Sequence, residues 1–102
     1  MTFVARLLWD PGNVAHIARH GVTPDEVEQV CHGQPAVSGS YDGRIRVLGI
    51  TLAGRMIMVI LAPRGEDTYL PVTVRPASRI ERNRYAALQK DMNHGSEQDR
   101  EA

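Results

Sequence analysis

The sequence has 102 residues, enough for one domain with a modest hydrophobic core and too few for two. Lys plus Arg number 12 and Asp plus Glu number 12, so the formal charge of zero excludes a globally basic nucleic-acid binder. The charges are nevertheless uneven, because residues 75–84 carry four Arg and one Glu whereas residues 24–28 carry three acidic residues and no basic one. We therefore expect one domain over residues 1–92 with a bipolar charge.

The cysteine content and the apolar runs indicate the cell compartment. The single cysteine, Cys31, cannot form an internal disulfide, and no apolar run approaches the roughly 20 residues of a membrane span. Residues 1–8 lack the charged start and the cleavage site of a signal peptide. These features predict a cytoplasmic protein in which Cys31 is a small buried hydrophobic residue.

The first third of the chain predicts a strand and two helices. Residues 3–9 form an apolar strand, and Asp10 followed by Pro11 is typical of a helix cap and a first helical position. The first helix covers about residues 11–20 and ends at a glycine. Thr23, with Glu26 three residues later, forms a capping box that begins a second helix reaching about residue 32. The two helices form an αα-hairpin.

The middle of the chain changes from helical to extended periodicity. Residues 56–62 are apolar at every position, which predicts a central strand covered on both faces. Pro71 has no amide hydrogen for a sheet ladder, so its strand lies at a sheet edge or is bulged there. The predicted strands cover residues 44–51, 56–62 and 68–74, and residues 36–40 form a weak strand or a loop.

A last helix follows the third of these strands. Ser78 and Glu81 form another capping box, so this helix begins close to Ser78 and continues to about residue 90 or 92. Its expected packing row consists of Ile80, Ala87 and Leu88. Residues 93–102 are polar and should be disordered. The predicted class is α+β, in the order β-α-α-β-β-β-α, with helices packed against an antiparallel sheet.

The junction between the last strand and the last helix gathers cationic side chains. Arg75 ends the strand, and Arg79 and Arg82 follow one turn apart on one side of the helix, whereas Arg84 points elsewhere. Tyr85 lies along the same row. Guanidinium groups match phosphate oxygens with paired donors, and a tyrosine can stack on a base or transfer a proton. A phosphodiester suits this chemistry best.

Simpler interpretations exist for each of these residues. Arg75 and Arg82 could form solvated ion pairs with Glu81 or with the acidic helix, and Tyr85 could cover the core. His20 stands at a helix end, where a histidine often serves the terminal carbonyl groups. The spacing of His16 and His20 also fits a metal pair, but the motif lacks the glutamate that would follow His16 in a zinc protease. We therefore expect no metal ion and no cofactor.

With these residues in view, the chain resembles the BrnT-type toxins of bacterial toxin–antitoxin pairs. The likeness extends from Trp9 to Tyr85. The features that match are Trp9-Asp10 at the end of the first strand, Arg19-His20-Gly21-Val22 at the end of the first helix, Glu26 in the second helix, and the closing run from Val74 to Tyr85 with its Glu-Arg-x-x-Tyr helix.

The resemblance implies a RelE-like ribonuclease fold and a toxin that cleaves or blocks RNA. It also implies a cognate antitoxin with a ribbon-helix-helix DNA-binding part that holds the toxin inactive. Carried over by position, it implies catalytic roles for Arg75, Arg82, Tyr85 and His20 and RNA-binding roles for Arg19 and Arg79.

Two further hypotheses stay open beside this one. The family usually carries a lysine early in the first helix, where this chain has Gly12 and Asn13. The first alternative is therefore a non-catalytic binding module that keeps the fold and the interaction with the antitoxin or a nucleic acid. The second alternative is a stand-alone domain with an unknown ligand.

Overall fold

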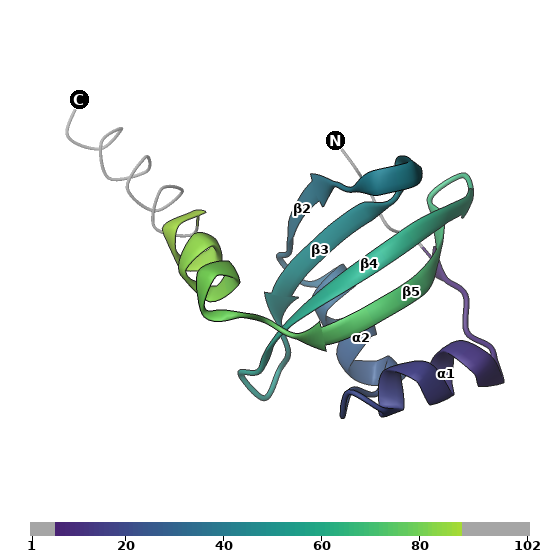
Figure 1. The fold of residues 1–102 in the computed structure, drawn as a ribbon, viewed down its shortest axis with the longest axis horizontal. Coiled ribbons are helices and arrows are strands. Elements are labelled where there is room, and N and C mark those ends of the chain that lie inside the picture. Colours follow the sequence, from purple (N-terminus) through teal and green to yellow (C-terminus); the bar gives the residue numbers. More distant parts are fainter. Residues whose placement is uncertain (1–5, 89–102) are drawn as a thin grey trace.

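The computed structural model describes residues 6–88 and contains one five-stranded sheet in the order β1-β5-β4-β3-β2 (Figure 1). A C-terminal helix follows β5, beginning at residue 79 and running through residue 88, where the described part ends. The other elements are β1 (Arg6–Leu7), α1 (Pro11–Ala18), α2 (Pro24–His32), β2 (Ala36–Gly39), the 3-10 turn η1 (Tyr41–Gly43), β3 (Ile45–Ile50), β4 (Met56–Gly65) and β5 (Thr68–Pro76).

This architecture confirms the α+β class, with small differences at the ends of elements. α1 stops at Ala18 rather than at residue 20, because Gly21 turns the chain with a positive φ of 71° and the last amides bond only three residues back. The weak segment at 36–39 is a strand, since it pairs with β3. Residues 3–5, the helix beyond 88 and the expected tail at 93–102 lie outside the described residues. Within the described part, no helix is long and apolar enough to cross a membrane.

β4 is the centre of the sheet, and its residues 57–62 are buried, as the unbroken apolar sequence of residues 56–62 predicted. Alternate residues of the strand belong to two separate hydrophobic cores. Ile57, Val59 and Leu61 belong to the core under α1 and α2, which also contains Ile17, Val22, Val27, Val30, Cys31, Val47 and Val74. Met58 and Ile60 belong to the second core, on the opposite face, together with Leu48, Ala77 and Tyr85. The two faces of the sheet therefore meet different helices.

β5 is paired on both sides and contains the irregularity that Pro71 predicted. Ile60 pairs with Thr73 and Leu61 with Pro71, so one extra residue of β5 is bulged between these pairs. The pairings β2–β3, β3–β4 and β4–β5 are antiparallel, as expected. β1 instead joins β5 in parallel over two residues, which extends the sheet at this edge.

The C-terminal helix is attached through its first turn and one tyrosine. The predicted capping box forms: the Ser78 amide donates to Glu81 Oε1 at 2.8 Å, and the Glu81 amide donates to Ser78 Oγ at 3.2 Å. Tyr85 is 7% exposed and its hydroxyl donates to the Gln34 carbonyl at 2.9 Å. The expected packing row is wrong, because Ile80 is 71% exposed. The helix instead turns its Glu81 and Tyr85 face toward the sheet.

The same turn is held by an ion pair between strand and helix. Arg75 Nη1 and Nη2 donate to the two carboxylate oxygens of Glu81 at 2.7 and 2.9 Å. Partial burial alone would raise the pKa of Glu81, but the hydrogen bonds from Arg75 and Ser78 outweigh it and leave that pKa below its ordinary value. One carboxylate thus serves both the helix cap and the end of β5.

Gly49 of β3 is expected to tolerate no side chain. A Cβ there would lie 2.9 Å from Val30 Cγ1 and 3.5 Å from Pro35 Cα, and a buried β-branched residue in a helix cannot easily change its rotamer. Gly49→Ala should therefore destabilise the fold by about 1–3 kcal/mol, measured by thermal and urea unfolding. Gly39→Ala is the matched control, because a Cβ there meets nothing within 4 Å. Equal melting temperatures for the two variants would contradict this close packing of α2 on β3.

The lowered pKa of Glu81 predicts a pH dependence. A carboxylate whose pKa is lower in the folded state stabilises that state above its unfolded pKa, and the stabilisation is lost as the pH falls through the folded value. Wild type should therefore be more stable than Glu81→Gln at neutral pH, and the difference should shrink under acidic conditions. Urea unfolding at a series of pH values measures it. A difference that stays constant down to the acidic limit would show that the carboxylate charge is not responsible.

Candidate functional site

Five of the ten arginines between residues 6 and 88 lie on the sheet face opposite α1 and α2 or on the C-terminal helix. Arg75 of β5 lies opposite Met58, and Arg46 of β3 lies opposite Ile60, so both belong to the same face as the second core. The C-terminal helix adds Arg79, Arg82 and Arg84, against a single carboxylate, Glu81. The acidic residues at the starts of α1 and α2 belong to the opposite layer of the molecule.

Arg75 is positioned by the end of β5 but is already engaged in part. Its guanidinium donates to both oxygens of Glu81 and also to the Pro76 carbonyl at 3.3 Å. The side chain is still 44% exposed. Since a guanidinium has five N–H donors, some remain for a bound anion. Arg75 therefore combines a structural contact with a free outer edge.

Arg79 and Arg82 lie on the exposed part of the C-terminal helix. Neither side chain makes a hydrogen bond or an ion pair with any other residue between 6 and 88. At about 100° per residue, the inward positions of this helix are 81, 84, 85 and 88, so Arg79 points almost directly away from the sheet and Arg82 points to one side. Both are available to a ligand approaching from solvent.

Tyr85 lies on the inward side of the helix and is separated from these two arginines. It packs in the second core, where its ring is buried and its hydroxyl is occupied by the Gln34 carbonyl. The alternative that Tyr85 covers the core thus describes its contacts in this structure. Its phenol is not on the exposed surface that Arg79 and Arg82 share.

Arg19 and His20 lie at the end of α1, on the other layer of the molecule. Both are exposed, and within residues 6–88 no hydrogen bond or ion pair joins either side chain to Arg75. The His20 ring meets the His16 ring edge to face, with 5.7 Å between centroids. The structure therefore does not join the histidine to the arginines of the junction by a direct contact.

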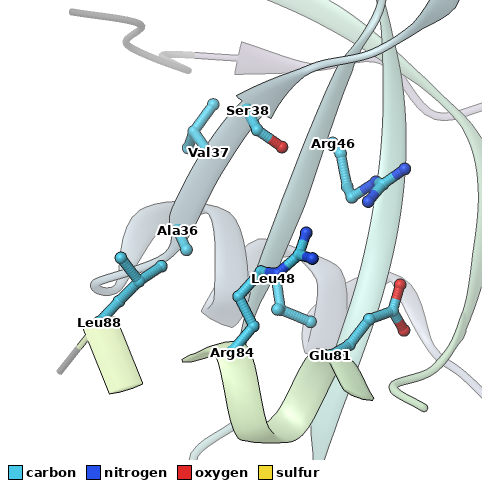
Figure 2. A pocket seen from close by; sticks show the side chains of 8 residues that line it. All are labelled: Ala36, Val37, Ser38, Arg46, Leu48, Glu81, Arg84 and Leu88. Atoms are coloured by element: carbon cyan, nitrogen blue, oxygen red, sulfur yellow. The ribbon is translucent and has the colours of Figure 1, made fainter. Parts of the chain in front are cut away.

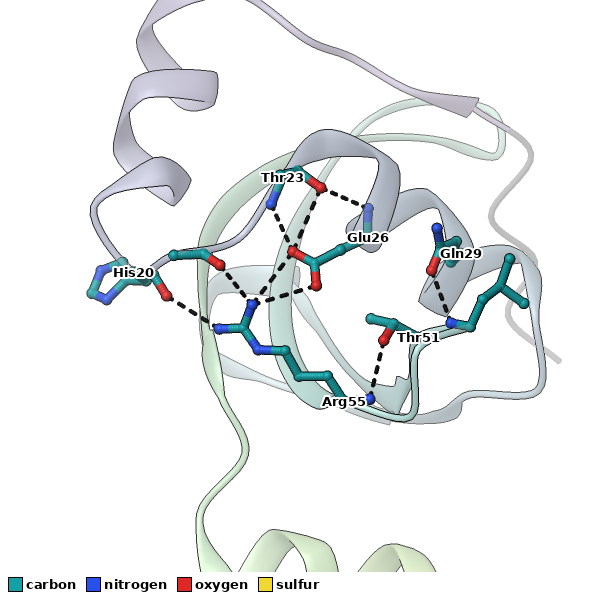
Figure 3. A network of polar contacts seen from close by, with 8 residues as sticks. His20, Thr23, Glu26, Gln29, Thr51 and Arg55 are labelled. Atoms are coloured by element: carbon teal, nitrogen blue, oxygen red, sulfur yellow. Dashed lines mark hydrogen bonds and ion pairs between the residues drawn. The ribbon is translucent and has the colours of Figure 1, made fainter.

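Arg55, which no motif in the sequence singles out, anchors the segment that contains His20 (Figure 3). Its Nη1 donates to the Gly21 carbonyl at 2.6 Å and lies 3.4 Å from both Glu26 oxygens, and its Nη2 donates to the His20 carbonyl at 3.4 Å. Gln29 adds a bond from the Leu52 amide at 2.9 Å. These contacts fasten the β3–β4 turn to the linker between α1 and α2, and they use the His20 backbone while leaving its imidazole exposed.

Two further arginines, Arg46 and Arg84, line a pocket between the C-terminal helix and the β2–β3 edge (Figure 2). The helical period predicted that Arg84 points away from the row of Arg79 and Arg82, and in the structure it faces this pocket. The alternation of residues 44–51 contained the signal for Arg46, since it is in phase with Leu48. Arg84 faces inward because Tyr85, its neighbour, is the residue that docks the helix.

His32 is engaged by a carboxylate of its own helix. His32 Nε2 lies 2.9 Å from Glu28 Oε1, and Glu28 Oε2 accepts a bond from Trp9 Nε1 at 2.9 Å. Among the residues that the structure describes, no group of three or more His, Cys, Asp and Glu side chains is placed to hold a metal ion. Cys31 is buried, and burial raises the pKa of its thiol to about 12, as expected for an inert core cysteine.

Comparison with known proteins gives a structural match and no match by sequence. No protein-family model matches the chain, and no curated protein matches its sequence. Among solved structures, the chain is similar to the 1.1 Å crystal structure of the Brucella abortus ribonuclease toxin BrnT, with a TM-score of 0.59 and 25% sequence identity. The match covers 72% of this chain and 97% of the BrnT chain. The resemblance seen in the sequence is thereby confirmed: the chain has the fold of a BrnT-type toxin.

Proposed function

We propose that this chain is the toxin of a bacterial toxin–antitoxin pair and acts as a metal-independent endoribonuclease that inhibits translation. The observation that supports this most directly is the set of arginines on one sheet face and its helix, in a fold shared with a ribonuclease toxin. RNA carries one negative charge per nucleotide, so such a surface attracts it even though the whole chain is neutral.

The proposed chemistry needs three contributions from the protein. Cleavage of RNA without a metal requires activation of the 2′-hydroxyl, stabilisation of the pentacovalent phosphate and protonation of the leaving oxygen. We assign the second contribution to Arg75 and Arg82, whose guanidinium groups stay charged at physiological pH. His20 and Tyr85 are the candidates for proton transfer, and Arg19 and Arg79 for holding the RNA backbone. The exposed imidazole of His20 is the more accessible of the two proton carriers.

A non-catalytic binding module is the second candidate, and one observation favours it. Two of the four proposed catalytic residues are committed to internal contacts, Arg75 with Glu81 and Tyr85 with Gln34. In that case the arginines would bind RNA or the antitoxin without cleaving. Cleavage and binding must therefore be measured separately.

RNA cleavage by the purified protein tests the catalytic proposal. In EDTA, wild type should convert RNA to fragments ending in 2′,3′-cyclic phosphate. Arg82→Ala should reduce the single-turnover rate by about 10²-fold or more, because it removes a cation from the transition state. Arg75→Lys should reduce it less than Arg75→Ala, since the charge remains while the paired donors are lost.

Arg64→Ala provides the matched control, because Arg64 is exposed at the far end of β4 and bonds only to the Pro63 carbonyl among the described residues. It should cleave at the wild-type rate. Circular dichroism and melting temperatures must show that all variants are folded. Intact RNA at a large excess of wild-type protein would reject the endoribonuclease in favour of the binding module.

A cognate antitoxin should be encoded beside this chain. We expect a short neighbouring reading frame for a protein with a ribbon-helix-helix part, and co-expression should yield a stable complex that no longer inhibits translation. Affinity purification followed by a translation assay measures both effects. A neighbouring protein of this kind that neither binds the chain nor restores translation would contradict the proposed pairing.

A further inference from the structure

The pocket that contains Arg46 and Arg84 has no role in the function proposed above. It lies where the C-terminal helix passes over the β2–β3 edge, and its volume is about 110 Å³ (Figure 2). Ala36, Val37, Leu48 and Leu88 form apolar walls, and Ser38 adds a hydroxyl. The two guanidinium groups enter from different elements, Arg46 from β3 and Arg84 from the helix.

The charge inside this pocket is uncompensated among the described residues. Glu81 lines the pocket, but its oxygens accept bonds from Arg75 and from the Ser78 amide. Within residues 6–88, neither Arg46 nor Arg84 forms an ion pair, and Arg46 Nε is buried without an acceptor. Burying the Arg46 Nε donor without an acceptor costs free energy, and the positive charges of Arg46 and Arg84 repel each other. A bound anion would remove both costs.

The size and shape of the pocket favour a compact oxyanion. An apolar cavity of about 150 Å³ holds a single benzene ring, and the present pocket, at about 110 Å³, is smaller than that and smaller still than a site that would enclose a nucleobase. A tetrahedral phosphate is compact, and its oxygens match the planar donors of two guanidinium groups. The apolar walls formed by Leu48 and Leu88 suit the carbon atoms of an attached ribose.

The position of the pocket relates it to the arginines at the junction. Arg46 and Arg75 lie on the same face of the sheet and are separated by β4 alone, so their strands are about 10 Å apart. We propose that Arg46 and Arg84 form a second phosphate subsite, which binds the backbone phosphate of a nucleotide flanking the scissile bond. This subsite rests on the proposed action on RNA, and its two arginines bind the substrate without taking part in the reaction.

Salt-dependent RNA binding tests the subsite independently of cleavage. The probe is a short single-stranded RNA that is 2′-O-methylated throughout and so cannot be cut. For single strands, the logarithm of the affinity falls with the logarithm of salt concentration with a slope of about −0.7 per phosphate contacted. The double variant R46Q/R84Q should bind about tenfold or more weakly at low salt and should lose about 0.7 of this slope.

Three controls make the result specific. R64Q removes one positive charge at a distant exposed site and should bind as wild type does. R46K keeps the charge and should keep most of the slope. Cleavage of unmodified RNA by wild type is measured in parallel, so a failure of the proposed ribonuclease is seen separately from a failure of the subsite.

Two outcomes would overturn the subsite. If R46Q/R84Q has wild-type affinity and slope, the two arginines bind no RNA, and a lower melting temperature of the variant would assign them a role in stability instead. If wild type binds an acidic peptide and R46Q/R84Q does not, while both proteins bind RNA equally well, the pocket accepts carboxylates of a protein partner instead. A reduced slope in R46Q/R84Q, with R64Q unchanged, supports the phosphate subsite.

Discussion

The burial of β4 on both faces is the constraint on which the rest of this structure depends. Residues 56–62 of this strand are apolar at every position, and such a segment must be covered on both faces, so the sheet needs helices on two sides. α1 and α2 cover one face with a tightly packed core, in which Gly49 allows α2 to lie directly against β3. Within residues 6–88, the C-terminal helix is the only helix on the other face; its Tyr85 joins a smaller core together with Ala77, which precedes the helix.

The unequal covering explains why the charged surface lies where it does. The face under α1 and α2 is filled mostly by buried aliphatic residues of the first core. The opposite face is covered at one end, and its remaining strand positions include Arg46 and Arg75. Because the helix that covers it also carries arginines, sheet and helix form one cationic surface on a chain whose formal charge is zero.

Glu81 links the stability of this surface to its chemistry. It completes the helix cap with Ser78, pairs with Arg75 and lines the pocket of Arg46 and Arg84. If Glu81 were neutral, the guanidinium groups of Arg46, Arg75 and Arg84 would lie near the first turn of the helix without its negative charge. The pair also fixes the direction in which the helix leaves the sheet, which decides that Arg84 faces the strands and that Arg79 faces solvent.

The sequence by itself determined the features that depend on neighbouring residues. Hydrogen bonds that reach across one helical turn form the capping boxes of Thr23 and Ser78. The apolar content of residues 56–62 is enough to predict their burial. The α+β class and the bulge near Pro71 follow in the same way. The likeness to the BrnT-type toxins could be seen at this level, because its motifs are short and ordered along the chain.

Only the tertiary structure decided which residues of the last helix face the sheet. Periodicity shows which residues share a side of a helix but not which side is buried. That choice depends on the bond between Tyr85 and Gln34, 51 residues apart in sequence, and on the register that places Arg46 and Arg75 on one face. For this reason the sequence indicated the arginines of the junction but not that Arg46 and Arg84 line one pocket.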